Sequence, residues 1–344
     1  MFFMQRSVRA LAIAALLFAG GGAVAQPASD LYKGRNVDLY IGYSAGGGYD
    51  LYARALARFI GRHLPGNPTV TPRNMEGAGS LRLANWLYNL GPKDGLSFGT
   101  FARGTAFDPL FGSTQAQFDA SKYNWIGSAN NEVSTCVMWA AGGVTTMDDL
   151  LTKPSVMGGS GGAADTDQFV YVMNGVLGTK IKLVQGYPGG NEVNLAMERG
   201  EVQGRCGWSW SSLKTTHPEW LRDKKVTVPV QLSLTRHPEL PDTPVIMDYA
   251  KSDADRAILR LVFARNIMGR PFAAPPGVAP ERVAILRKAF TDTMNDKDFL
   301  AEAAKIDLEI NPVSGEELQS LVADAYKTSP DIVKRTADLL KGMK

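Results

Sequence analysis

A strand, a glycine turn and a helix follow one another without interruption near the start of the chain. An apolar strand at 37–43 runs into Gly46, Gly47 and Gly48, and apolar residues recur at helical spacing in 49–62. Three consecutive glycines allow positive φ and let backbone N–H groups approach a ligand. The helix directs its unpaired N–H groups and the positive end of its dipole at the same place. This unit predicts either a binding site for a carboxylate or phosphate, or a plain connection between strand and helix.

A second copy of this arrangement stands between residues 156 and 177. A short apolar strand leads into Gly158-Gly159-Ser160-Gly161-Gly162, and the helix that follows is stopped by Gly178. Two helix ends that both favour an anion suggest two lobes facing a shared cleft.

Strands alternate with helices in both halves, which predicts an α/β fold with parallel strands and right-handed crossovers. Ligands of such sheets bind outside the carboxyl ends of the strands, and the loops expected there are rich in small polar residues. We expect strands at 37–43, 68–74, 96–101, 124–128, 135–140 and 181–185, and helices at 49–62, 79–90, 146–151 and 192–199.

The last third is predicted to be scaffold. A strand at 227–232 is followed by a proline-marked loop and by a strand at 260–268 that returns to the first lobe. Helices are expected at 281–294 behind Pro280, at 297–305 behind the cap Asp296, and after the capping box of Ser314 and Glu317. The expected division is a signal peptide at 1–25, a first lobe of 26–123 with 228–344, and a second lobe of 124–227.

The first 25 residues have the pattern of a secretory signal peptide. Arg6 and Arg9 precede an uncharged apolar run, and Ala23-Val24-Ala25 has the small residues of a cleavage site. Cleavage there makes Gln26 the first residue of an exported, soluble protein. The remaining chain has 35 basic and 34 acidic side chains, and this near-balance argues against a nucleic-acid surface.

The two cysteines, Cys136 and Cys206, each lie in a short apolar segment typical of a strand. In an oxidising compartment they can pair if the two strands are neighbours; the alternative is two separate buried thiols. The three histidines do not stand at the spacing of metal ligands, so we expect no metal site and no cofactor.

Several short motifs occur in an order that resembles one family. After the glycine turn and Asp50 come Asn74-Met75-Glu76-Gly77-Ala78-Gly79-Ser80, Pro92-Lys93-Asp94-Gly95, the second glycine loop, Gly186-Tyr187-Pro188-Gly189-Gly190, Leu240-Pro241-Asp242-Thr243-Pro244 and Phe272-Ala273-Ala274-Pro275-Pro276-Gly277-Val278. This order resembles the Bug family of periplasmic solute receptors of tripartite tricarboxylate transporters, over about residues 34 to 340.

The resemblance implies a Venus flytrap of two lobes, each a mixed sheet flanked by helices. It implies a monomer without enzymatic activity that binds a small carboxylate, such as a di- or tricarboxylate, and delivers it to a membrane permease. One ligand carboxylate is then held largely by backbone N–H groups and water. The residues that match the family's loops are Ser44, Ala45, Gly46, Gly47, Gly48, Asp50 and Gly79; Gly159, Ser160, Gly161, Gly162 and Asp165; and, for the rest of the ligand, Arg103, Gly104, Thr105, Tyr187, Pro188 and Gly189.

Individual residues have simpler alternatives. Asp50 either contacts the ligand or only caps its helix, and Arg103 either pairs with a second carboxylate or is a solvated loop charge. Arg205 lies beside Cys206 in what we expect to be a buried strand. The family often has proline and threonine where this chain has Ala45 and Tyr49, so these positions are expected to reshape the pocket.

Two other functions fit parts of the sequence. Gly158–Gly162 matches the G-x-S-x-G elbow of serine hydrolases, with Ser160 as nucleophile and His217 or His237 later in the chain. The binding chemistry is also shared by receptors that report ligand occupancy to a signalling partner. A dinucleotide site is not favoured, because the first turn lacks the G-x-G-x-x-G spacing.

Overall fold

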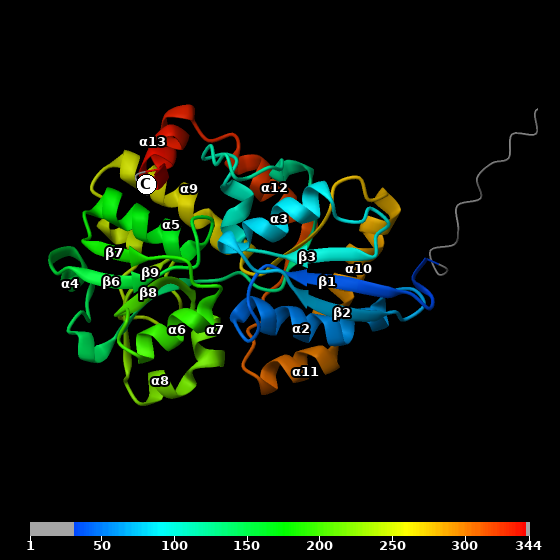
Figure 1. The fold of residues 1–344 in the computed structure, drawn as a ribbon, viewed down its shortest axis with the longest axis horizontal. Helices are drawn as coiled ribbons and strands as arrows, with labels where there is room; N and C mark the ends of the chain where they lie inside the picture. Colours follow the sequence, from blue (N-terminus) through cyan, green and yellow to red (C-terminus); the bar gives the residue numbers. More distant parts are fainter. Residues whose placement is uncertain (1–30, 342–344) are drawn as a thin grey trace, which may run out of the picture.

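Two β-sheets, each flanked by helices, form two lobes in the computed structural model, which describes residues 31–341 (Figure 1). The predicted signal peptide at 1–25 lies outside the described residues. Within 31–341, no helix combines the length and the apolar character needed to cross a membrane.

The first lobe is built on a six-stranded mixed sheet in the order β11-β4-β10-β3-β1-β2. Strand β1 pairs in parallel with both β2 and β3, whereas β10, β4 and β11 run antiparallel to their neighbours. The alternation in β1 explains its place, because Val37, Leu39 and Ile41 point into the core and are fully buried. The strands are β1 (Asn36–Ile41), β2 (Thr69–Asn74), β3 (Ser97–Thr100), β4 (Asn124–Ser128), β10 (Pro271–Ala274) and β11 (Val313–Ser314).

Within residues 31–341, the α-helices of this lobe are α2 (Gly48–Ile60), α3 (Leu81–Asn89), α10 (Pro280–Met294), α11 (Lys297–Lys305) and α12 (Gly315–Ala325). Helix α11 packs on α2, which lies along β1 and β2 (Figure 1). Two predicted caps are confirmed. The Asp296 side chain accepts hydrogen bonds from the first backbone N–H groups of α11, and Ser314 and Glu317 form a capping box at α12.

The second lobe is built on a five-stranded sheet in the order β7-β6-β8-β5-β9. Its strands are β5 (Ser134–Trp139), β6 (Ser155–Gly158), β7 (Ile181–Val184), β8 (Gly204–Ser209) and β9 (Val226–Leu232). Its helices are α4 (Met147–Thr152), α5 (Asp165–Val172), α6 (Gly190–Glu198), α7 (Trp210–Thr216), α8 (Pro218–Arg222), α9 (Asp253–Phe263) and α13 (Pro330–Lys341).

The boundaries between the lobes differ from those expected. Strand β4 at 124–128 pairs with β10 and β11 in the first sheet, so the chain crosses only after it, at 129–133. Strand β9 at 226–232 pairs with β5 and stays in the second sheet. The sequence could not reveal either assignment, because a strand's alternation shows that it has a buried face and not which sheet it joins.

The segment 260–268 is helical, and the expected strand there is wrong. It comprises the end of α9 and a short 3₁₀ turn, and the strand that returns to the first lobe is β10. Ser252 caps α9, and its apolar residues recur at helical spacing and are buried, with Phe263 against Phe169 of α5. The chain crosses once more after α12, because α13 packs on α5 and α9 (Figure 1).

A disulfide joins Cys136 of β5 to Cys206 of β8 in the middle of the second sheet. The two strands are antiparallel neighbours, which is the arrangement that pairing requires. Both cysteines are fully buried among apolar side chains.

Replacing both cysteines with serine should destabilise the protein. The disulfide closes a loop across a sequence separation of 70 residues, and the chain-entropy estimate for such a loop is roughly 4 kcal/mol. We expect guanidinium unfolding, followed by circular dichroism, to show a lower midpoint for the double variant and for the reduced wild type. The variant itself is the control, since reductant should not move its midpoint. An unchanged wild-type midpoint under reductant would contradict this expectation.

Candidate functional site

A cavity of about 70 Å³ lies between the two lobes, at the carboxyl ends of strands from both sheets. The loops after β1 and β3 approach it from the first lobe, and the loop after β6 and the end of β8 approach it from the second. This is the place where α/β sheets generally bind ligands.

Asp50 shapes the first glycine turn and does not line the cavity. Its Oδ2 accepts a hydrogen bond from the Gly46 N–H at 2.8 Å, and Arg54 Nε donates to both carboxylate oxygens, at 2.9 and 2.8 Å. Burial opposes ionisation, but the hydrogen bonds from Arg54 and Gly46 hold the pKa of Asp50 below its ordinary value. Gly47 and Gly48 therefore remain as the part of the turn that faces the cavity.

The second glycine loop uses its amides for its own structure. The Ser160 N–H donates to Thr166 Oγ1 at 3.1 Å, and the Gly161 N–H donates to Asp167 Oδ2 at 3.1 Å. The loop also contacts the opposite lobe, since the Gly79 N–H donates to the Ser160 carbonyl at 3.1 Å. These amides are thus engaged, and the expectation that they hold a ligand does not follow from this geometry.

Three buried arginines line the cavity: Arg103, Arg205 and Arg270. Their relative solvent-accessible areas are only 2%, 7% and 2%, so their guanidinium groups lie away from bulk water. Each has one buried N–H group without a hydrogen-bond partner among the described residues, namely Arg103 Nη1, Arg205 Nε and Arg270 Nε. Unpaired charged donors of this kind are costly in a folded protein, so their convergence indicates a place for an acceptor.

The three arginines differ in their counter-charges. Arg103 donates through Nε to Asp165 at 2.5 Å, and Arg270 lies 3.6 Å from the Glu132 carboxylate. Burial lowers the pKa of Arg103, but Asp165 outweighs this and holds it above the ordinary value. Arg205 has no carboxylate within 4 Å in the part of the chain that the structure describes.

Behind Arg103, a buried polar network extends into the second lobe. Arg265 lies 3.5 Å from Asp165 and donates to Gln168 Oε1, and Gln168 Nε2 donates to Asp108 Oδ1 at 2.7 Å. Burial raises the pKa of Asp108 to about 7, partly opposed by the hydrogen bond from Gln168. The cavity is therefore connected to titratable groups in the interior.

The structure brings only part of the predicted site to the cavity. The predicted residues that line it are Ser44, Gly47, Gly48, Arg103, Ser160 and Asp165. Those that do not line it are Ala45, Gly46, Asp50, Gly79, Gly104, Thr105, Gly159, Gly161, Gly162, Tyr187, Pro188 and Gly189. Several of the latter turn the backbone or pack against the other lobe; a Cβ at Gly79, for example, would lie 2.6 Å from the Ala164 nitrogen.

Sequence reasoning missed Arg270 and gave Arg205 a structural role. Both stand next to apolar strand residues. Because a charged residue is rarely buried without a partner, a basic residue in such a segment is the sequence signal that could have identified them as site residues. Tyr49, which the sequence suggested would reshape the pocket, also lines it, as do Gly190 of the Gly186–Gly190 motif and Trp208. The lining residues for which the sequence gave no role in the pocket are Tyr43, Ala102, Ala164, Thr166, Asn191, Asn194, Gly207, Ser209, Ser212 and Thr216.

The parts of a serine-hydrolase triad lie apart. Ser160 Oγ pairs with Thr166 Oγ1 at 3.2 Å. His217 is hydrogen-bonded to Asn194 and Glu219, and the His237 Nδ1 accepts from the Glu239 N–H. No hydrogen bond between Ser160 and a histidine is formed within residues 31–341.

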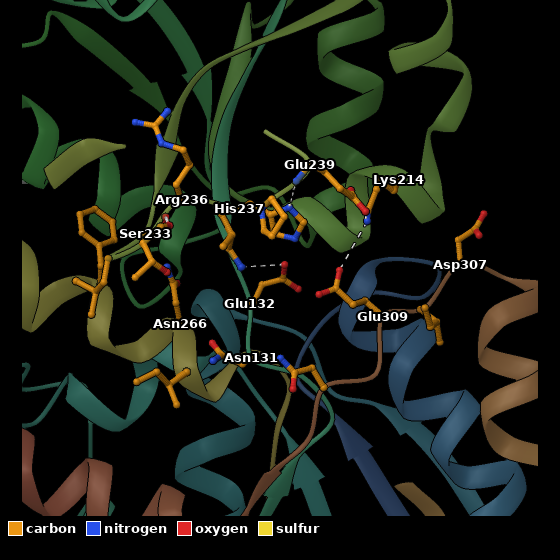
Figure 2. Close-up of a pocket in the computed structure, with 18 of the residues that line it drawn as sticks. Asn131, Glu132, Lys214, Ser233, Arg236, His237, Glu239, Asn266, Asp307 and Glu309 are labelled. Carbon is orange, nitrogen blue, oxygen red and sulfur yellow. Dashed lines mark hydrogen bonds and ion pairs between the residues drawn. The ribbon is translucent and has the colours of Figure 1, made fainter. Parts of the chain in front are cut away.

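A larger open groove, of about 1120 Å³, lies where the crossing segments meet (Figure 2). Lys214 lies between Glu239 and Glu309, at 2.7 and 3.7 Å, and Glu132 also lines the groove (Figure 2). None of the predicted ligand-binding residues lines this groove. The described residues also contain no group of three or more His, Cys, Asp or Glu side chains that could hold a metal ion.

The sequence matches no known protein-family model and no curated protein, but the fold has close counterparts among solved structures. The periplasmic binding protein BugD is 20% identical, with a TM-score of 0.71 over 90% of this chain and 98% of that one. Rpa4515 of R. palustris with adipate is 18% identical, with a TM-score of 0.69 over 88% and 97%. MatC of Rhodopseudomonas palustris with bound malate is 16% identical, with a TM-score of 0.69 over 87% and 99%. The chain thus has the two-lobe α/β fold of periplasmic binding proteins, as the sequence predicted.

Asp108→Asn should stabilise the protein increasingly as the pH rises from about 4 to 7. The pKa of Asp108 is about 7 in the folded protein against an ordinary value of 3.8, so between these values the folded state holds a proton that the unfolded chain releases. The stability that depends on this proton is complete below the unfolded pKa and is lost as the pH rises through the folded pKa.

The measurement is the difference in unfolding free energy between variant and wild type, from denaturant titrations at several pH values. We expect this difference to grow in favour of asparagine up to about pH 7 and then to stay constant. A difference that does not change with pH would show that Asp108 titrates normally.

Proposed function

We propose that this protein is a periplasmic solute receptor of the Bug type, which captures a small carboxylate between its lobes. In this proposal it acts as a monomer and delivers the ligand to the permease of a tripartite tricarboxylate transporter. The N-terminal export pattern, the order of the sequence motifs and the shared fold support the assignment. Adipate and malate in two structures of the same fold support the ligand class.

The observation that carries the proposal is that three buried arginines, each with one unpaired N–H group, line the cavity between the lobes. Hydrogen bonds between charged groups contribute roughly 1.5–3 kcal/mol each. Three of them contribute about 4.5–9 kcal/mol, whereas a micromolar dissociation constant requires about 8.2 kcal/mol net. Further contacts with the ligand must therefore offset the costs of association. In this proposal side-chain cations, together with Gly47 and Gly48 at the start of α2, bind the carboxylate that the family resemblance assigned largely to backbone N–H groups and water.

The size of the cavity limits the ligand. One water needs about 10–15 Å³ of such space, so a cavity of about 70 Å³ accepts only a compact anion without movement of the lobes. A longer acid requires partial opening.

Contacts across the cleft explain how a ligand could favour closure. Ser44 Oγ donates to Glu192 at 3.0 Å, and Asn191 Nδ2 donates to the Ala45 carbonyl at 3.0 Å. With the Gly79–Ser160 hydrogen bond and the Arg103–Asp165 ion pair, they are polar contacts that hold the lobes together around the cavity. A ligand that bridges Arg103 and Arg205 binds the closed state better than the open one and shifts the equilibrium towards it.

Isothermal titration calorimetry of the mature protein against succinate, malate, adipate and their amides tests the proposal. We expect the acids to bind with micromolar dissociation constants and the neutral amides not to bind. If no acid and no other small anion binds, the proposal is wrong.

Gly47→Val should abolish this binding and leave the fold intact. A Cβ at Gly47 meets no atom within 4 Å, so the side chain enters open space beside the cavity. Gly142→Ala is the matched control, because a Cβ there makes only ordinary contacts with Gln203. Unfolding midpoints near the wild-type value for both variants would show that any loss of binding is local. Unimpaired binding by Gly47→Val would place the ligand elsewhere.

The two other functions have separate tests. A serine hydrolase would cleave a p-nitrophenyl ester in a manner abolished by Ser160→Ala, whereas we expect equal background rates for wild type and variant. A signalling receptor would bind the same acids but would form a ligand-dependent complex with a sensor protein in place of the permease.

A further inference from the structure

Arg205 differs from every other buried arginine in the described chain by lacking a carboxylate partner. Its Nη1 donates to the Gly190 carbonyl and to Asn194 Oδ1, each at 3.0 Å, and both acceptors are neutral. Its guanidinium carbon lies 4.4 Å from the centre of the Trp208 ring. By contrast, Arg103 and Arg265 share Asp165, and Arg270 faces Glu132.

This isolated charge is expensive to bury. Neutral hydrogen bonds and a cation–π contact offset only part of the lost hydration of a guanidinium group. Burial accordingly lowers the pKa of Arg205 to about 9, although Tyr43 and Glu192 act in the opposite direction. The Glu192 carboxylate itself accepts a hydrogen bond from Ser44. Arg205 still carries its charge at neutral pH, so the chain leaves one positive charge at the cavity unmatched.

The orientation of the side chain indicates what could match it. Since Nη1 is used, the Nε–Nη2 edge has no hydrogen-bond partner among residues 31–341, and Arg205 Nε is buried. Two parallel N–H groups on one edge of a guanidinium fit the two oxygens of a carboxylate. Arg205 belongs to β8 of the second lobe, whereas Arg103 and Arg270 adjoin strands of the first. A ligand with one anionic group at each end can meet both sides.

We propose that the Nε–Nη2 edge of Arg205 binds a second anionic group of the ligand, so that the protein selects dicarboxylates over monocarboxylates of equal length. This inference rests on the proposed function, since it assumes that the cavity holds a carboxylate. Arg205 is then the residue that determines the charge of the accepted ligand.

Calorimetry with matched pairs of acids tests it: succinate against butyrate, and adipate against hexanoate. For the wild type we expect the dicarboxylate of each pair to bind about tenfold to a hundredfold more tightly, the range of one charged hydrogen-bonded contact. Arg205→Gln should lose this preference through weaker dicarboxylate binding, with monocarboxylate binding changed by less than about threefold. Arg205→Lys retains the positive charge but lacks two parallel N–H groups, so it should keep part of the preference for the dicarboxylate that Arg205→Gln loses.

Arg236→Gln is the control, because Arg236 is a solvent-exposed arginine that lines the larger open groove and not the cavity. It should leave both affinities unchanged. If Arg205→Gln weakens the binding of both acids of a pair equally, Arg205 has a structural role only and the inference is overturned. A wild type that binds both acids of a pair with equal affinity would also overturn it. If the wild type binds neither acid, the proposed function fails and the inference fails with it. If the glutamine variant does not fold, the wild-type ratio and the lysine variant decide.

Discussion

The burial of guanidinium groups between two lobes is the constraint on which this structure depends. A buried cation requires either a counter-ion or a full set of hydrogen bonds. Arg103 meets this requirement by reaching from the loop after β3 to Asp165 at the start of α5, and Arg270 by facing Glu132 in the crossing segment. The charges that shape the cavity thus also join the lobes, so ligand binding and lobe closure share the same groups.

The same requirement explains why the cavity is not isolated from the interior. Asp165 contacts two arginines, Arg103 and Arg265. Arg265 is in turn hydrogen-bonded to Gln168, and Gln168 to Asp108. In a medium of low polarity the hydrogen bonds of such a network are coupled, so that the loss of one weakens the others. A substitution of Gln168 in the second lobe can therefore alter the geometry of Arg103, which lines the cavity.

Local features of the fold could be predicted from the sequence, and its long-range pairings could not. Asp296, Ser314 and Glu317 act within one helical turn, so their caps follow from spacing alone. The position of the glycine turn at the end of β1 is also local. The sheet that β4 joins depends on pairing with β10, which lies far along the chain. Within the candidate site, sequence identified the loops, but the partners of individual amides are set by side chains such as Asp167 and Thr166. The orientation of Arg205 depends on Trp208 and Gly190, whose placement only the folded chain reveals.

The return of α13 to the second lobe places the first and last described residues on different bodies. Residue 31 precedes β1 in the first lobe, and Lys341 ends a helix packed on α5 and α9 (Figure 1). A relative rotation of the two halves must therefore change the distance between these ends. A pair of fluorophores attached near them would report the motion by energy transfer without touching the cleft.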